Sequence, residues 1–435
     1  MIEQKSVPKL RFSEFDNDWL LNSTEIKILA GNAYKLNEYM DNGYLLIQGL
    51  HIQPNNITLE EKPKYVSREG GKHLKIVKGD IVLGLNRPIT NNQLKACRFN
   101  LESESVLYQR AGKLAFDVSK IDSEFLYQYL KNNKFMKQLE VQLIGSDQPY
   151  IRSNLFQATK NIFPTFPEQQ KIASFLSKVD KKIELLTEKK AKLTEYKKGV
   201  IQQLFNGSFS HVSHSAQNSL GEQNDKPTFI PPTLRFKADD GSEFPDWEEK
   251  KLEALAELTS SKRVYSSDYS EVGVPFFRGK EVSELRLGIM PEDILYITKE
   301  AFIEFKDKYG APVEGDILIT AVGTLANVLR VNGEFEFYFK DGNLIWLRDP
   351  QCDSKFLSIL LDASKNKILQ TAIGSSQKAL TIIELKKIVV SLPTLLEQQK
   401  MATFISAIDQ KIDLANTELE KAKHWKKGLL QQMFV

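Results

Sequence analysis

The phrase PDWEEKK (245–251) gathers acidic and lysine side chains in a way that superficially resembles a metal-dependent nuclease. Such an enzyme needs its carboxylates and its lysine on separate strand positions that converge on one metal ion, and Asp246, Glu248 and Lys250 are too close together for that. His211 and His214 form an HxxH pair, but no further ligand lies near them in the sequence. These patterns predict no metal site, and an autonomous nuclease is the least favoured function.

Other signatures of catalysis are missing from the sequence. It contains neither a GxxxxGK[ST] phosphate loop nor a GxGxxG nucleotide motif. The Asn-Pro-Pro-aromatic phrase of amino-methyltransferases is also missing, since Pro231 and Pro232 stand in IPPT. Only five histidines are present, which disfavours general-base chemistry. We therefore expect a binding protein that performs no reaction and holds no metal or cofactor of its own.

Composition sets broad limits on the fold and on the partners. The 435 residues exceed the usual size of one domain, and 41% of them are hydrophobic, as in ordinary globular proteins. The net charge is only +3, so a nucleic-acid partner would require basic residues focused on particular surfaces. Two unpaired cysteines, no long apolar run and no signal peptide at the N-terminus predict a cytoplasmic protein without membrane association.

The chain contains an internal repeat. EQQKIASFLSKVDKKI begins at Glu168 and EQQKMATFISAIDQKI begins at Glu397, and a gap-free alignment continues to Phe205 and Phe434. Shorter phrases recur in the same order in both halves: PKLRF and PTLRF, KGDIVL and EGDILI, GSDQ and GSSQ. We infer a tandem duplication whose helical ends stayed alike while the stretches between the repeated phrases diverged.

Each repeated tail predicts a long helix, because apolar residues recur at heptad spacing. A helix of this length would extend roughly 57 Å, and its apolar seam needs a partner helix, for which the other copy is the obvious choice. Lys190 and Lys197 interrupt the first seam and Lys426 the second. The predicted seam residues are Ile172, Leu176, Val179, Ile183, Leu186, Leu193, Val200 and Leu204 in the first helix, and Met401, Ile405, Ile408, Ile412, Ala415, Leu419, Ala422, Leu429 and Met433 in the second.

Ahead of each helix the sequence predicts a domain of mixed strands and helices, which makes the whole an α+β protein. The predicted strands are DIVLGL and KLAFDV in the first half, and DILITAV, NVLRV, EFEFYF, NLIWL and KIVVSLP in the second. The predicted helices are SEFLYQYLKNNKFMKQL and SKFLSILLDASKNKILQ. Residues 207–231, rich in Ser, Asn, Gly and Pro, predict a flexible linker. The expected domain boundaries are 1–165, 166–206, 207–231, 232–393 and 394–435.

These repeated phrases, together with PDW…KL (245–252), resemble the specificity subunit of type I restriction–modification enzymes over nearly the whole chain. The first half departs from the pattern at FDNDWLLNST, which lacks the proline before Trp19. The resemblance implies two target recognition domains that read the two parts of a bipartite, asymmetric DNA sequence. It implies that the helices pair antiparallel, set the unread spacer and dock two modification (methyltransferase) subunits, which restriction (motor-nuclease) subunits join. S-adenosylmethionine, ATP and Mg²⁺ would belong to those partners. The alternative is a coiled-coil scaffold that assembles partners without reading DNA.

Readout of base edges requires side chains such as Arg, Asn, Gln and Lys on loops, and phosphate contacts can also use Ser and backbone amides. The alternative for these loops is a solvated surface turn. The first-half candidates are Asn86, Arg87, Asn91, Asn92 and Gln93 after DIVLGL, with Ser146, Gln148, Tyr150 and Arg152 in GSDQPYIR. The second-half candidates are Thr324 after DILITAVG, Ser375, Ser376, Gln377 and Lys378 in GSSQK, and Arg278 and Lys280 in FFRGK. Gly145 and Gly374 are expected to shape their turns rather than to touch a base.

Overall fold

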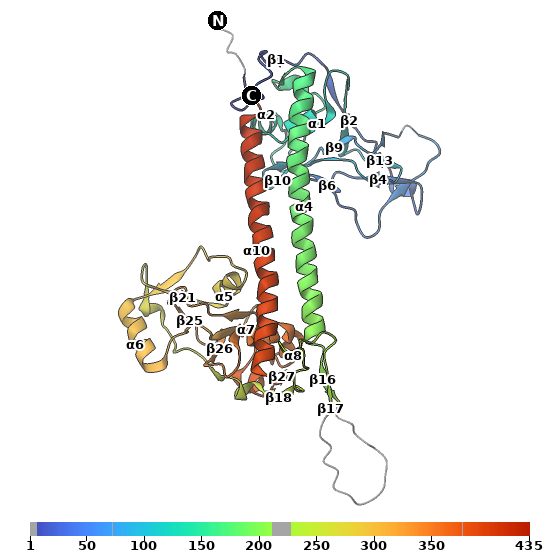
Figure 1. The fold of residues 1–435 in the computed structure, drawn as a ribbon. Coiled ribbons are helices and arrows are strands. Elements are labelled where there is room, and N and C mark those ends of the chain that lie inside the picture. The colour runs from blue at the N-terminus through green and yellow to red at the C-terminus, as the bar shows by residue number, and fades with distance from the viewer. Residues whose placement is uncertain (1–6, 72, 211–227, 376) are drawn as a thin grey trace, which may run out of the picture. The chain divides into compact units, whose positions relative to one another are not determined.

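The computed structural model describes residues 7–71, 73–210, 228–375 and 377–435. The chain divides into two compact units, one made of residues 1–189 and 415–435 and the other of residues 190–414 (Figure 1). Each unit contains one globular domain and a part of each of two long helices, α4 (Phe166–Leu204) and α10 (Leu395–Gln432). The two predicted long helices are therefore confirmed.

The long helices pair within each unit. In the first unit, Leu186 of α4 packs against Leu419 and Ala422 of α10. In the second unit, Val200 and Leu204 near the end of α4 share a core with Met401, Ile405 and Ile408 near the start of α10. Because the end of each helix lies with the beginning of the other, the pairing is antiparallel, as the resemblance implied (Figure 1).

The predicted heptad seam is buried almost throughout. Ile183, Leu193 and Ile412 are half-buried, and the other seam residues are fully buried. Two of the three interrupting lysines form ion pairs between the helices: Lys197 Nζ lies 2.6 Å from Asp409 Oδ1, and Lys426 pairs with Asp180. A charged residue in the seam is tolerated here because its charge meets an opposite charge on the facing helix.

The first globular domain contains two main sheets, with strand orders β12-β9-β14-β2 and β3-β7-β4-β13-β8. Apolar residues of the first sheet pack against α1 and α2 and against the two long helices in one core, which includes Ile81, Phe125, Leu176 and Met433. The strands are β1 (Leu20–Leu21), β2 (Ile26–Ala30), β3 (Tyr39–Met40), β4 (Tyr44–Ile47), β5 (Ile52–Gln53), β6 (Asn56–Ile57), β7 (Tyr65–Val66), β8 (Lys75–Ile76), β9 (Ile81–Gly84), β10 (Ile89–Thr90), β11 (Gln93–Leu94), β12 (Ala96–Arg98), β13 (Ser105–Leu107), β14 (Ala111–Phe116) and β15 (Ile162–Phe163). The helices are α1 (Ser123–Tyr129), α2 (Asn133–Gln142) and α3 (Leu155–Ala158).

The second globular domain repeats this plan, with sheets ordered β19-β26-β23-β24 and β20-β22-β21-β25. Its main core joins Ile317, Phe356 and Leu385 to Met401 of α10. The strands are β18 (Glu248–Lys251), β19 (Glu257–Thr259), β20 (Tyr269–Ser270), β21 (Val274–Phe277), β22 (Leu295–Ile297), β23 (Ile317–Thr320), β24 (Val328–Arg330), β25 (Tyr338–Phe339), β26 (Leu344–Arg348) and β27 (Val389–Leu392). The helices are α5 (Gly279–Arg286), α6 (Lys299–Tyr309), α7 (Ser354–Ala363), α8 (Lys365–Gln370) and α9 (Ile382–Lys386).

Three predicted elements differ in detail from the structure. The helical run at 123–139 divides into α1 and α2, because Asn132 Oδ1 accepts a hydrogen bond from Phe135 N and caps a new helix. The run at 354–370 divides at Ser364 into α7 and α8. In EFEFYF only Tyr338–Phe339 is a strand, while the rings of Phe335 and Phe337 pack against Phe277.

The ends of the predicted linker form a short antiparallel ribbon, β16 (Ser208–Ser210) with β17 (Thr228–Ile230). The HxxH pair, His211 and His214, lies outside the described residues. The flexibility of the linker and the predicted domain boundaries stay predictions.

The repeated phrases meet in space at the start of each long helix. The carboxylate of Glu168, which is buried, accepts hydrogen bonds from Arg11 Nε at 2.8 Å and from Trp19 Nε1 at 3.2 Å. In the second unit, Glu397 accepts equivalent bonds from Arg235 Nε at 3.1 Å and Trp247 Nε1 at 3.3 Å. The phrases LRF, DW and EQQ are therefore parts of one buried polar contact in each half, and Trp19 occupies the same place as Trp247 despite the missing proline.

Candidate nucleic-acid interface

Three loops of the first domain meet just after strand β9, around Leu85. Leu85 N donates to Arg110 O at 3.0 Å, in the turn between β13 and β14, and Leu85 O accepts from Ile151 N at 2.9 Å. The backbone therefore joins the loop after β9 to the 108–110 turn on one side and to the 145–150 turn on the other. Candidate residues that are far apart in the sequence come together here.

The loop after β9 and the GSDQPYIR loop are held against each other by further backbone contacts. Arg87 N donates to Pro149 O at 2.7 Å, and Asn86 forms an isolated β-bridge with Tyr150. Arg87, Gln148 and Tyr150 are exposed, and Asn86 is half-buried. This arrangement presents a guanidinium, an amide and a phenol together at one edge of the domain, which suits contact with phosphates and base edges.

Asn91 and Asn92 have a local structural role. They form the two-residue turn of the hairpin between β10 and β11, with φ of 49° and 57°. Positive φ at both central positions is the geometry of a tight type I′ turn, which asparagine tolerates better than most residues. Their side chains and that of Gln93 are exposed, so the turn geometry is compatible with DNA contact and does not demonstrate it.

The second domain builds the same junction around Ala321, just after β23. Ala321 N donates to Asn343 O at 2.8 Å, and Ala321 O accepts from Leu380 N at 2.9 Å. Val322 forms an isolated β-bridge with Ala379, which places Thr324 and the GSSQK loop on neighbouring segments. The Thr324 hydroxyl lies 3.3 Å from Ser283 Oγ of helix α5.

The glycines of the two repeated turns are needed for backbone reasons. Gly145 has φ of 91° and Gly374 has φ of 116°. A Cβ atom on Gly374 would lie 2.3 Å from the carbonyl oxygen of Gln377. Both the positive φ and this close approach favour glycine, so the geometry agrees with the predicted role in shaping the turns.

Arg278 is already engaged within the domain. It lies at the N-terminus of α5 and its guanidinium pairs with the buried Glu281, with Nε 3.1 Å from Oε1. Burial raises the pKa of Glu281, but hydrogen bonds from Arg278 and the backbone outweigh it and leave that pKa below its ordinary value. Lys280 is exposed, with Nζ 3.8 Å from Glu284 Oε1. Of this pair, Lys280 is thus the freer to reach a phosphate.

Most of the candidate side chains are exposed. Asn86 and Arg278 are half-buried, and Ser376 lies outside the described residues. The exposed candidates are Arg87, Asn91, Asn92, Gln93, Ser146, Gln148, Tyr150, Arg152, Lys280, Thr324, Ser375, Gln377 and Lys378. Contact with DNA stays a prediction for each of them.

The third loop of each junction was not singled out from the sequence. It carries Gln109 and Arg110 in the first domain and Lys340 and Asn343 in the second. Gln109, Arg110 and Lys340 are exposed, and Asn343 is half-buried. In the first domain, the polar turn YQR before strand β14 could have marked this loop in the sequence. Its position beside Leu85, however, depends on a backbone hydrogen bond between residues far apart in the sequence.

Within residues 7–71, 73–210, 228–375 and 377–435, no group of three or more His, Cys, Asp or Glu residues could hold a metal ion. The helices of those same ranges include none that is long and apolar enough to cross a membrane.

A family model described as the type I restriction modification DNA specificity domain matches residues 26–195 and again residues 245–424. These two matches cover most of the sequence and coincide with its two repeats. The chain belongs to this family.

Individual relatives agree with the family match. The type I restriction enzyme MjaVIII specificity subunit of Methanocaldococcus jannaschii is 31% identical over 212 residues, which are 48% of this chain and 50% of that protein. The putative MjaX specificity subunit of the same organism is 26% identical over 325 residues, 70% of this chain and 65% of that protein. The alignments thus span between half and just under two thirds of the length of these curated relatives.

The fold also has a counterpart among solved structures. The S subunit of the type I restriction–modification system from M. genitalium matches with a TM-score of 0.54 at 16% identity, over 99% of both chains. At this identity the likeness concerns the fold alone.

Proposed function

We propose that this chain is the sequence-specific DNA-recognition subunit of a type I restriction–modification complex, in which each domain reads one part of a bipartite, asymmetric target. The observation that carries the proposal is the doubled loop junction. Leu85 and Ala321 make the same two backbone hydrogen bonds to the same two neighbouring loops, yet the exposed side chains around them differ. One backbone frame with two different polar surfaces is what two readers of different half-sites require.

The chemistry of the loops supports base readout over simple adhesion to phosphates. The first junction presents Arg87 and Gln148, and the β10–β11 hairpin presents Asn92; these side chains can make paired hydrogen bonds to guanine or adenine. The second presents Gln377 with Thr324 and Lys378, a mixture of base-reading and phosphate-binding groups. The small net charge of +3 agrees with binding that depends on particular surfaces.

The proposal extends to the partners. The paired helices α4 and α10 would set the spacing between the half-sites and dock two modification subunits, which restriction subunits would join. Methylation of adenine with S-adenosylmethionine, and cleavage driven by ATP with Mg²⁺, would belong to those subunits, and this chain would be non-catalytic in the cytoplasm.

Mapping methylated adenines in a host strain, with and without this gene, tests the proposal. A bipartite motif that is methylated only when the gene is present is the expected result. An unchanged methylation pattern in a strain that expresses the modification subunits would support the alternative of a scaffold without DNA readout.

A further inference from the structure

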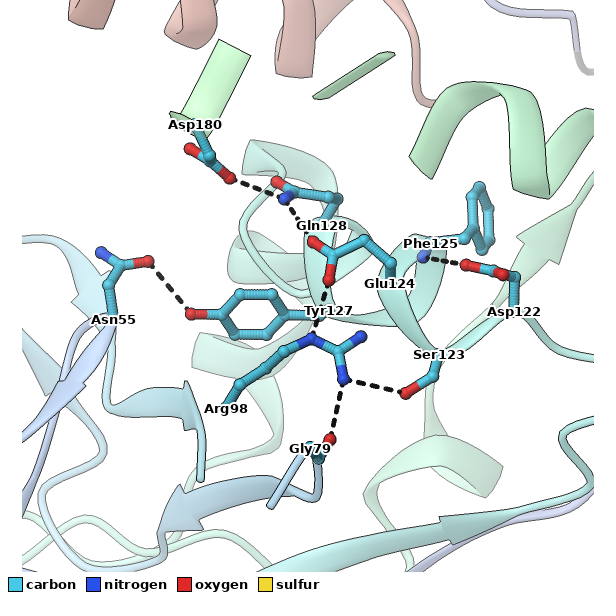
Figure 2. A network of polar contacts seen from close by, with 10 residues as sticks. All are labelled: Asn55, Gly79, Arg98, Asp122, Ser123, Glu124, Phe125, Tyr127, Gln128 and Asp180. Atoms are coloured by element: carbon cyan, nitrogen blue, oxygen red, sulfur yellow. Dashed lines mark hydrogen bonds and ion pairs between the residues drawn. The ribbon is translucent and has the colours of Figure 1, made fainter. Parts of the chain in front are cut away.

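A buried polar chain joins strand β12 of the first domain to the long helices. Gln128 of α1 is fully buried, and its Nε2 donates to Asp180 Oδ2 at 2.8 Å and to Glu124 Oε1 at 2.8 Å. Glu124 Oε2 accepts from Arg98 Nε of β12 at 2.7 Å, and Asp180 Oδ1 pairs with Lys426 of α10. Figure 2 shows the part of this chain that runs from Asp180 of α4, through α1, to Arg98. We call this set of residues the relay.

Arg98 fixes the base of the strands that carry a candidate reading loop. It is the last residue of β12 and lies opposite Ile81, the first residue of β9. Its Nη1 donates to Gly79 O, in the turn before β9, at 2.8 Å. The loop of residues 85–95, which joins the other ends of these two strands, carries Arg87 and the β10–β11 hairpin. The relay therefore extends from the helix pair to the foot of both strands.

The middle of the relay is interrupted in the second unit. Asp122 Oδ1 caps α1 and Asp353 Oδ1 caps α7, each by accepting a 2.8 Å hydrogen bond from the backbone N–H three residues further along. Counting from these caps, Ile359 stands at the position of Gln128. Ile359 packs against the apolar core that contains Ile408 of α10. An isoleucine side chain has no hydrogen-bonding group, so it cannot link α7 to a polar group of the long helices.

The strand end of the relay also differs between the two units. Arg330, the last residue of β24, corresponds to Arg98 by its place in the sheet. Its Nε donates to Ser354 Oγ at 2.8 Å. Counting from the same caps, Lys355 stands where the first domain has Glu124. An ammonium group thus replaces the carboxylate that accepts from the arginine in the first domain.

The amide of Gln128 is costly if packing is its only role. In the part of the chain that the structure describes, its Oε1 is buried and has no hydrogen-bond partner. An unpaired polar atom in a protein interior destabilises the folded state, whereas an apolar side chain of similar shape avoids this cost. The second domain has such a side chain, Ile359, at the same position. The two N–H bonds to carboxylates therefore indicate that the amide serves to connect its neighbours.

Positive groups balance the two carboxylates of the relay. Lys426 pairs with Asp180, and Arg98 pairs with Glu124. Burial is the main cause that lowers the pKa of Lys131, to about 7, and the charge of Lys426 lowers it further. Asp180 and Glu124 raise the pKa of the same group. Because each carboxylate has a cationic partner, both can stay charged within the domain and hold the amide between them.

We propose that Gln128 is a positioning residue for DNA reading by the first domain, since it joins the strands that carry the loop 85–95 to the helix pair. The second domain has an apolar contact at this position, so its reading does not depend on it. The first half-site, meaning the one that the first domain reads, thus depends on a side chain that touches no DNA. The inference rests on the proposed function, because it assigns the loop 85–95 to DNA.

DNA binding by the full chain, assembled with its modification subunits, tests this inference. The target duplex is compared with one whose first half-site is scrambled and with one whose second half-site is scrambled. Gln128→Leu keeps a similar volume but removes both N–H donors. It should reduce discrimination at the first half-site about tenfold, the order of one base contact, and leave the second unchanged. Unchanged discrimination at both half-sites, or an equal loss at both, would overturn the proposal.

Two controls separate positioning from a general loss of stability. Ile359→Leu changes the equivalent position of the second domain and should leave discrimination at both half-sites unchanged. Asn132→Ala removes another buried polar side chain of the first domain, the cap of α2, which lies outside the relay. It should lower the melting temperature without changing discrimination. A loss at the first half-site as large as that of Gln128→Leu would assign the effect to destabilisation and overturn the proposal.

Hydrogen–deuterium exchange without DNA separates a failure of the relay from a failure of the proposed function. Gln128→Leu should speed exchange severalfold in β12 and in residues 85–95, whereas Ile359→Leu should leave exchange in residues 321–330 as in the wild type. A wild-type complex that discriminates neither half-site would contradict the proposed function, and exchange would then decide on the relay by itself. Unchanged exchange in β12 would overturn the relay in either case.

Discussion

The buried contact between Arg11, Trp19 and Glu168 provides the sharpest test of how the first domain is joined to α4. Glu168→Ala would leave the Arg11 guanidinium, whose side chain is only 12% exposed, and the Trp19 N–H without their acceptor. Removing one partner of a buried ion pair typically costs about 3–5 kcal/mol. For a unit of this size, each kcal/mol shifts the melting temperature by roughly 2–4 °C. The expected decrease is therefore roughly 6–20 °C for the transition of the first unit.

Differential scanning calorimetry of the full chain would measure this decrease, with two controls. Glu168→Gln keeps an acceptor for Trp19 and should give a smaller decrease. Glu14→Ala removes an ion pair to Lys171 in which both side chains are about half exposed, and it should leave the melting temperature unchanged. A Glu168→Ala protein that melts within 2 °C of the wild type would refute the structural role assigned to the repeated glutamate.

Further predictions concern charge, DNA readout and helix length. Because the pKa of Lys131 is lowered to about 7, the native state loses this proton before the unfolded state does, so stability should rise as the pH increases from about 7 to about 10.5. Urea denaturation of Lys131→Met should show a weaker rise, and parallel curves would contradict the shift. Gln148→Ala and Gln377→Ala should reduce discrimination between target and scrambled duplexes by about 1–3 kcal/mol, whereas equal loss on both duplexes would assign these residues to the DNA backbone or to loop structure. Four residues inserted into α4 near Thr187, and four into α10 beside Leu419, should lengthen each helix by roughly 6 Å and the methylated spacer by one or two base pairs. An unchanged spacer with full methylation would show that the helices do not set it.

The long helices could be predicted in detail because their signal is local and repeated. Heptad spacing identified the seam from Ile172 to Leu204, and the structure buries or half-buries each of its predicted residues. The heptad pattern gave no reason for the lysines that interrupt the seam. The position of Lys197 is explained by its ion pair with Asp409, which lies far along the sequence on the facing helix.

The structural role of the repeated phrases could not be predicted, because it depends on contacts between residues far apart in the sequence. EQQ was recognised as a repeat, but its glutamate binds Arg11 and Trp19, some 150 residues earlier in the chain. The helix predicted over residues 123–139 is interrupted at Asn132, because the Asn132 side chain accepts a hydrogen bond from Phe135 N and caps a new helix, although the apolar periodicity continues. The loop with Arg110 joined the candidate interface through a backbone bond to Leu85 that no local pattern encodes.

A domain exchange tests the central claim most directly. Residues 1–165 would be replaced by the equivalent domain of a relative with a different target, and the methylated adenines of a host that carries the hybrid would be mapped. Independent reading by two domains predicts that one half of the methylated motif changes to that of the relative, while the other half is retained. A hybrid that changes both halves together, or that methylates the original motif unchanged, would contradict the account.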